Sequence, residues 1–159
     1  MTSHRENLDK LSALNTPLCP RAVWRVVTLT VVTLGLYYFV WLGLTWSEMK
    51  RELRDETMYP VWHALTQFVP VYGWFRLYEH FQTINVMLYR AETPPAVNPG
   101  NVVRAAVIAT VVGFFANLLI FDGLGELLYT AVVVWFVARG QAGLNAYWKA
   151  RAASHTVSL

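Results

Sequence analysis

Charge is scarce in this sequence, and it is missing from long windows rather than thinned evenly along the chain. Asp, Glu, Lys and Arg make up 14% of the 159 residues, whereas a soluble domain is about a quarter charged, and hydrophobic residues make up 55%. Residues 26–46 hold no charge, although Arg25 precedes them and Glu48 follows. A helix of that length measures about 31 Å, which matches the hydrocarbon core of a bilayer. The pattern predicts a membrane-spanning helix and argues against an ordinary water-soluble domain.

Several kinds of chemistry lack their usual residues. The single Cys19 excludes an internal disulfide, and no Cys/His spacing suggests a bound metal. His63 and His80 are the histidines near apolar runs, but they are separated by Pro70, so we expect hydrogen-bonded side chains and not ligands of a haem or metal. There is no nucleophile arrangement, no phosphate-binding glycine loop and no HExxH. The sequence therefore predicts no enzyme activity, no cofactor and no metal.

The remaining apolar runs predict an all-α integral membrane fold. Its four transmembrane helices form two hairpins, each followed by an amphipathic helix, because only helices satisfy their own backbone in lipid. Leu77, Phe81, Ile84 and Leu88 repeat at helical spacing and mark the first amphipathic helix. The predicted spans are about 22–47, 58–75, 102–121 and 124–139, with amphipathic helices at 76–90 and 141–151. A polar N-terminal segment, 1–20, precedes this domain of residues 21–151, and a tail, 152–159, follows it.

The second run, 58–75, raises two questions: whether its helix is continuous at Pro70 and whether it crosses the bilayer. Pro70 is interior to the run, and an interior proline removes a backbone hydrogen bond, so we expect a bend or break there. The run either spans the bilayer or lies in its interface.

With four spans and both termini in the cytoplasm, ten of the 13 Lys and Arg residues lie inside, in agreement with the positive-inside rule. Three basic residues are left outside: Lys50, Arg51 and Arg54.

A short pattern in the first span resembles a known family. Thr33, Gly35, Tyr37 and Trp41, followed by Trp46-Ser47-Glu48-Met49-Lys50, are similar to the bacterial membrane family called domain of unknown function 4234. The resemblance takes in residues 20–90, including Val69-Pro70-Val71-Tyr72-Gly73. It implies a helical module in the bacterial inner membrane, crossing it several times, and it implies no catalytic residues.

Two functions are open to such a protein. In the first, it is a non-catalytic accessory or structural subunit of a larger membrane complex, and acts by helix–helix packing with other subunits or with itself. The residues expected to pack are Gly35, Gly43, Gly113, Trp41 and Trp46, because small residues let helices approach closely. In the alternative, the break around Pro70 borders a site for a lipid or small ligand, contacted by Tyr72, Trp74, Arg76 and His80. Membrane lipids are expected partners. Nucleic acid is not, because the basic residues are not interleaved with aromatic ones.

Overall fold

Helices are the regular structure of the described part of this chain, which confirms the all-helical prediction. The computed structural model describes residues 20–120 and 123–157. Within these ranges there is no strand, and the elements are α2 (Val23–Val32), α3 (Tyr37–Leu53), α4 (Pro60–Leu65), the 3-10 helix η1 (Thr66–Phe68), α5 (Pro70–Arg90), α6 (Pro99–Leu119) and α7 (Leu124–Val157). Most of the N-terminal segment, Cys19 included, and the end of the tail lie outside the described residues.

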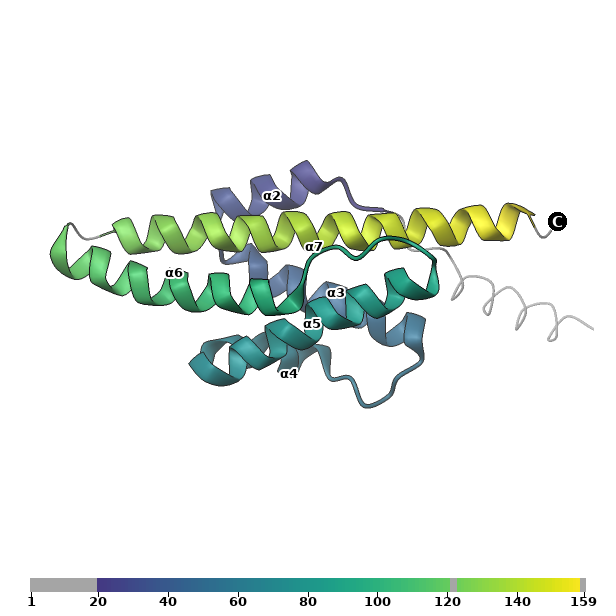
Figure 1. Cartoon of the computed structure of the whole chain (residues 1–159), viewed down its shortest axis with the longest axis horizontal. Helices are drawn as coiled ribbons and strands as arrows, with labels where there is room; N and C mark the ends of the chain where they lie inside the picture. The colour runs from purple at the N-terminus through teal and green to yellow at the C-terminus, as the bar shows by residue number, and fades with distance from the viewer. Residues whose placement is uncertain (1–19, 121–122, 158–159) are drawn as a thin grey trace, which may run out of the picture.

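The first apolar run reverses direction in its middle. Residues 22–47 were expected to form one spanning helix, but α2 and α3 run in opposite directions (Figure 1). Leu34 and Gly35 both have left-handed backbone, with φ of 50° and 90°, a conformation that glycine adopts without a steric cost. The single-helix prediction is wrong because a lack of charge shows where a chain avoids water, and does not show whether its backbone turns back.

The second run breaks where Pro70 predicts a break. The helix α4 has six residues, η1 follows it, and Val69 is extended before Pro70 opens α5. Run 58–75 is therefore not one span, and the predicted amphipathic helix 76–90 is the later part of α5. Its apolar face is confirmed: Leu77 is 2% exposed, and the other three residues of the repeat are fully buried.

The two longest apolar helices form a hairpin. Pro99 opens α6, and the Asn98 side chain accepts a hydrogen bond from the Gly100 backbone N–H at 2.8 Å, which caps the helix. The helix α7 is continuous, so the predicted span 124–139, the amphipathic helix 141–151 and the tail up to residue 157 are one helix. Both α6 and residues 124–154 of α7 are long and apolar enough to cross a membrane. The structure provides two such helices, so the four-span arrangement is not confirmed.

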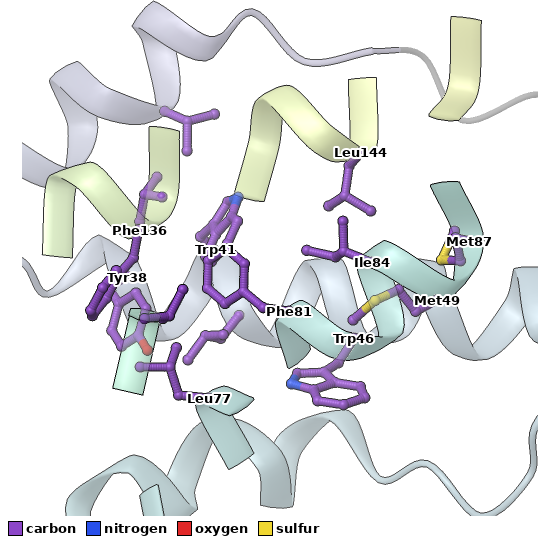
Figure 2. Close-up of a cluster of buried hydrophobic side chains, with 14 of the residues drawn as sticks. Tyr38, Trp41, Trp46, Met49, Leu77, Phe81, Ile84, Met87, Phe136 and Leu144 are labelled. Atoms are coloured by element: carbon purple, nitrogen blue, oxygen red, sulfur yellow. The ribbon is translucent and has the colours of Figure 1, made fainter. Parts of the chain in front are cut away.

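The core lies where α3, α5 and α7 meet. Figure 2 shows Trp41, Phe81 and Phe136 turned toward one another from these three helices. Gly140 of α7 makes this packing possible, because a Cβ there would lie 2.7 Å from the indole of Trp41. The indole N–H of Trp41 donates to Gln141 Oε1 at 2.9 Å. The first broken run is thereby anchored to the C-terminal helix by both packing and a buried hydrogen bond.

Candidate functional site

The candidate site is built at the break between α4 and α5. The 3-10 helix η1 follows α4 and packs against α5, and Gln67 Nε2 donates to the Gly73 carbonyl at 3.2 Å. Gly73 has no side chain to obstruct this contact, since a Cβ there would lie 3.1 Å from Gln67 Cα. The Gly73 backbone N–H donates to Val69 O at 2.7 Å and restarts the helical ladder after the extended residue. The break is thus a tight, internally bonded reversal.

A cavity of about 480 Å³ lies between α4 and α5, and the first residue of η1, Thr66, also lines it. One group of lining residues is aromatic: Tyr59, Trp62, Tyr72 and the ring of His63. The other group is polar: Thr57, Thr66 and Arg76. The combination offers flat apolar surface together with hydrogen-bond donors, which is the usual composition of a site for a small organic ligand.

Arg76 is held rigidly at the edge of this cavity. Its Nε and Nη2 donate to Tyr72 Oη at 3.1 Å and 2.5 Å, and Nη1 donates to Glu79 Oε2 at 2.5 Å. The guanidinium carbon lies 5.1 Å from the centroid of the Tyr72 ring. Glu79 balances the positive charge, and two of the five guanidinium N–H groups remain free for an acceptor. The site is therefore nearly neutral overall and rich in donors.

Two histidines and two tryptophans lie behind the cavity. The rings of His63 and Trp46 stack with centroids 4.3 Å apart, and the ring of His80 meets Trp46 at 5.2 Å and Trp41 at 5.3 Å, both edge-on. His80 is fully buried. Burial, and to a smaller extent nearby His63, lowers the pKa of His80 to about 3. His80 is therefore neutral at physiological pH.

The buried histidines lack hydrogen-bond partners. Neither ring nitrogen of His80 has one within the described structure, and the same holds for His63 Nδ1. Unpaired buried polar atoms are rare and costly, so they often mark a site that hydrogen-bonds a ligand. No group of three or more His, Cys, Asp or Glu side chains in residues 20–120 and 123–157 could hold a metal ion. The arrangement thus offers hydrogen bonds to an organic ligand.

The structure brings together some of the expected ligand-contact residues. Tyr72 and Arg76 line the cavity, and His80 lies one layer deeper. Trp74 is on the other side of α5 and packs against the hydrophobic core. Sequence reasoning missed the contribution of α4 and the residues on either side of it, namely Thr57, Tyr59, Trp62 and Thr66. A fold-back at Pro70, instead of a bend, would have placed these residues opposite Tyr72.

The expected packing residues lie mostly inside the chain. Trp41 and Trp46 are 0% and 3% exposed, so both belong to the core. A Cβ on Gly113 would lie 3.3 Å from Gly125, where α6 meets α7. Gly35 serves the turn between α2 and α3. Gly43, in contrast, has nothing within 4 Å of its Cβ position.

No family model, no curated protein and no solved structure matches this chain. The resemblance to domain of unknown function 4234 therefore stays a prediction.

Proposed function

We propose that this is a non-catalytic membrane protein that binds the polar head of a membrane-soluble amphiphile in the cavity between α4 and α5. The observation that carries the proposal is the coincidence, in one cavity, of a fixed guanidinium, an aromatic wall and a buried histidine with an unpaired nitrogen. A head group bearing phosphate, carboxylate or carbonyl oxygens would accept from the free N–H groups of Arg76 and from His63.

The surroundings of the cavity supply a place for the apolar part of such a ligand. Val61, Phe68, Val71 and Phe75 are 60% to 70% exposed on α4, η1 and the first turns of α5. Apolar surface of this extent costs free energy in water and none among acyl chains. A ligand with an oxygen-rich head and an alkyl tail fits both the cavity and this surface.

The binding test compares two substitutions that remove the same charge. Dodecyl phosphate is titrated into the purified protein in a non-ionic detergent, and binding is followed by isothermal calorimetry or native mass spectrometry. Loss of a hydrogen bond to a charged group costs about 1.5–3 kcal/mol, so Arg76→Gln should weaken binding about ten- to hundred-fold. Arg104→Gln is the control, because Arg104 is exposed on α6 and does not line the cavity. Equal affinities for the two variants would refute the proposed site.

A second proposal, assembly with other membrane subunits or with a second copy, is favoured by Gly43. Its face of α3 is open, and Val40 and Leu44 beside it are 54% and 42% exposed. A neighbouring helix could approach closely there. We expect Gly43→Leu to reduce the fraction of oligomer or complex seen after native purification from membranes. The idea fails if the wild-type protein is extracted alone and as a monomer.

A further inference from the structure

We propose that the chain enters the membrane from one side, with two of its three hairpins turning back inside the bilayer. In this arrangement α2–α3 and α4–α5 are re-entrant hairpins, and only the α6–α7 hairpin crosses. The acyl chains of the bilayer are the partner of the apolar tips, and the polar ends of the helices remain together at one surface. The arrangement does not depend on a ligand in the α4–α5 cavity.

The first support is the direction of the three reversals. Two fall at residues 33–36 and 66–69, and the third lies between the end of α6 at Leu119 and the start of α7 at Leu124. Figure 1 shows all three turned toward the same side of the molecule, with the α6–α7 tip projecting beyond the other two. Contacts between the tips agree with the picture. The rings of Phe39 and Phe68 stack with centroids 4.6 Å apart, and Tyr38 Oη lies 3.3 Å from Gln67 Oε1. Leu34 lines a shallow hollow together with Gly113 of α6 and other residues of that hairpin.

The second support is the position of the charges at the opposite end. Arg21, before α2, pairs with Glu48 of α3. Glu52, near the end of α3, pairs with Arg151 of α7. Arg139 donates to the carbonyl of Ala96 at 2.6 Å, in the connection that leads into α6. These contacts tie the open ends of the hairpins to one another and gather their ionised groups at one surface.

The third support is the surface of the tips. No Asp, Glu, Lys or Arg occurs in residues 26–47 or 57–75. Around the two turns the large apolar side chains point outward: Val32, Leu34 and Phe68 are 73%, 77% and 68% exposed. Two separate uncharged tips with this exposure, side by side and opposite a charged end, match the change in polarity from acyl chains to water.

The first turn also meets the strictest demand of a lipid environment, which is that no backbone donor is left unpaired. From Thr33 to Tyr38 each backbone N–H has an acceptor within the turn or the preceding helix. Thr33 contributes most: its Oγ1 accepts from the Tyr37 N–H at 2.9 Å and donates to Leu29 O at 2.8 Å. The reversal therefore needs no water.

The shorter helix of each re-entrant hairpin sets how deep that hairpin reaches, and the longer partners α3 and α5, with 17 and 21 residues, extend past the surface. The ten residues of α2 rise about 15 Å, and α4 with η1 rises about the same, which is half of a hydrocarbon core of about 30 Å. The 21 residues of α6 rise about 31 Å and reach the far surface. Near its tip, beside the exposed Leu119 and Ile120, this hairpin carries a polar pair with a carboxylate, which the other two tips lack: Asn117 Nδ2 donates to both carboxylate oxygens of Glu126 at 3.0 Å and 3.1 Å.

The arrangement also removes the weak point of a four-span topology. That topology leaves Lys50, Arg51 and Arg54 on the side opposite the other basic residues. With the α2–α3 hairpin re-entrant, these three residues lie on the same side as the rest, because α3 returns to the surface from which α2 entered. By the positive-inside rule, this surface faces the cytoplasm.

Labelling of single cysteines in sealed membrane vesicles tests the arrangement. In a Cys19→Ser background, Glu56→Cys reports on the connection after α3, Glu92→Cys on the connection after α5, and Ile120→Cys on the α6–α7 tip. All three positions are exposed in the structure. Arg51→Cys, exposed near the end of α3, is a second reporter if the Glu56 variant is poorly produced. Right-side-out and inside-out vesicles are each treated with a membrane-impermeant maleimide.

We expect positions 56 and 92 to react from the same side and position 120 to react only from the other. Four spans would instead make 56 react together with 120 and opposite 92, and that pattern would overturn the proposal. Reaction of 120 from neither side, or from the side of 92, would show that α6–α7 does not cross. Release of the chain from membranes by alkaline carbonate would overturn the proposal as well.

Discussion

Acid should destabilise this protein, and one buried side chain, His80, should account for a measurable part of the loss. The ring of His80 is enclosed by Trp41, Trp46 and Phe81, and it has no hydrogen-bond partner in the described structure. Its pKa of about 3 in the folded protein lies below the usual value of 6.5. As the pH falls below 6.5, the unfolded chain therefore binds a proton at this residue and the folded chain does not. Stability is present in full above pH 6.5 and is lost toward pH 3.

The expected loss follows from the difference between the two pKa values. Each pH unit between the two values costs about 1.4 kcal/mol, so lowering the pH from 7.5 to 5 removes about 2 kcal/mol at this residue. That is a large share of the 5–15 kcal/mol typical of a domain. His80→Leu should abolish this contribution and, because it also removes two unpaired polar atoms, should cost little at pH 7.5.

The measurement is the free energy of unfolding in mixed detergent micelles, followed by tryptophan fluorescence at pH 7.5, 6, 5 and 4.5. The useful quantity is the difference between wild type and His80→Leu, because other groups that titrate in this range cancel from it. The wild type should lose more stability than the variant, by about 2 kcal/mol at pH 5. Parallel pH profiles for the two proteins would show that His80 is not held neutral by burial, and would refute the reasoning.

Three further predictions concern packing and turns, each measured by the same unfolding assay. Gly125→Ala places a Cβ against a backbone carbonyl of α6 and should lower the free energy of unfolding by about 1–3 kcal/mol. Gly43→Ala is the control: its Cβ meets nothing within 4 Å, so it should be neutral or stabilising. Equal effects of the two substitutions would contradict the α6–α7 contact. Gln141→Leu leaves the buried indole N–H of Trp41 unpaired and should cost about 1–3 kcal/mol. Adding Trp41→Phe should then cost less than it does in the wild type, and strict additivity would argue against the hydrogen bond. Thr33→Val removes the acceptor of a helix-start N–H and should cost about 0.5–2 kcal/mol; an unchanged stability would show that the turn pairs its backbone in another way.

The helical class and the buried faces could be predicted from the sequence because they depend on local spacing. The repeat of Leu77, Phe81, Ile84 and Leu88 predicted the buried face of α5, since residues three and four apart share one side of a helix. Pro70 likewise marked the break, because its ring excludes a helical interior hydrogen bond. These are effects of one residue on its own turn of backbone.

The reversal of α2 and α3 and the make-up of the cavity could not be predicted in this way. An uncharged run of 21 residues has the same composition whether it crosses a bilayer or turns back inside it. The cavity likewise forms only if the chain folds back at Pro70, and the composition of the run does not distinguish a fold-back from a bend. Only the fold-back places Trp62 and His63 opposite Tyr72 and Arg76. The sequence analysis treated each run as a continuous helix, and it therefore placed the site on α5 alone.

The structure gives the short motifs of the family resemblance a physical meaning. In Thr-x-Gly-x-Tyr, Thr33 accepts from the N–H of Tyr37, and Gly35 supplies one of the two left-handed residues between them. In Val-Pro-x-x-Gly, Val69 is extended, the proline begins the new helix, and Gly73 lets the preceding turn pack closely. Both motifs lie at hairpin tips, and the first pairs the backbone N–H groups of its turn without help from water. A pattern that looks like membrane-spanning helix interrupted by small residues is therefore better understood as two turns, which in the arrangement proposed above close inside the bilayer.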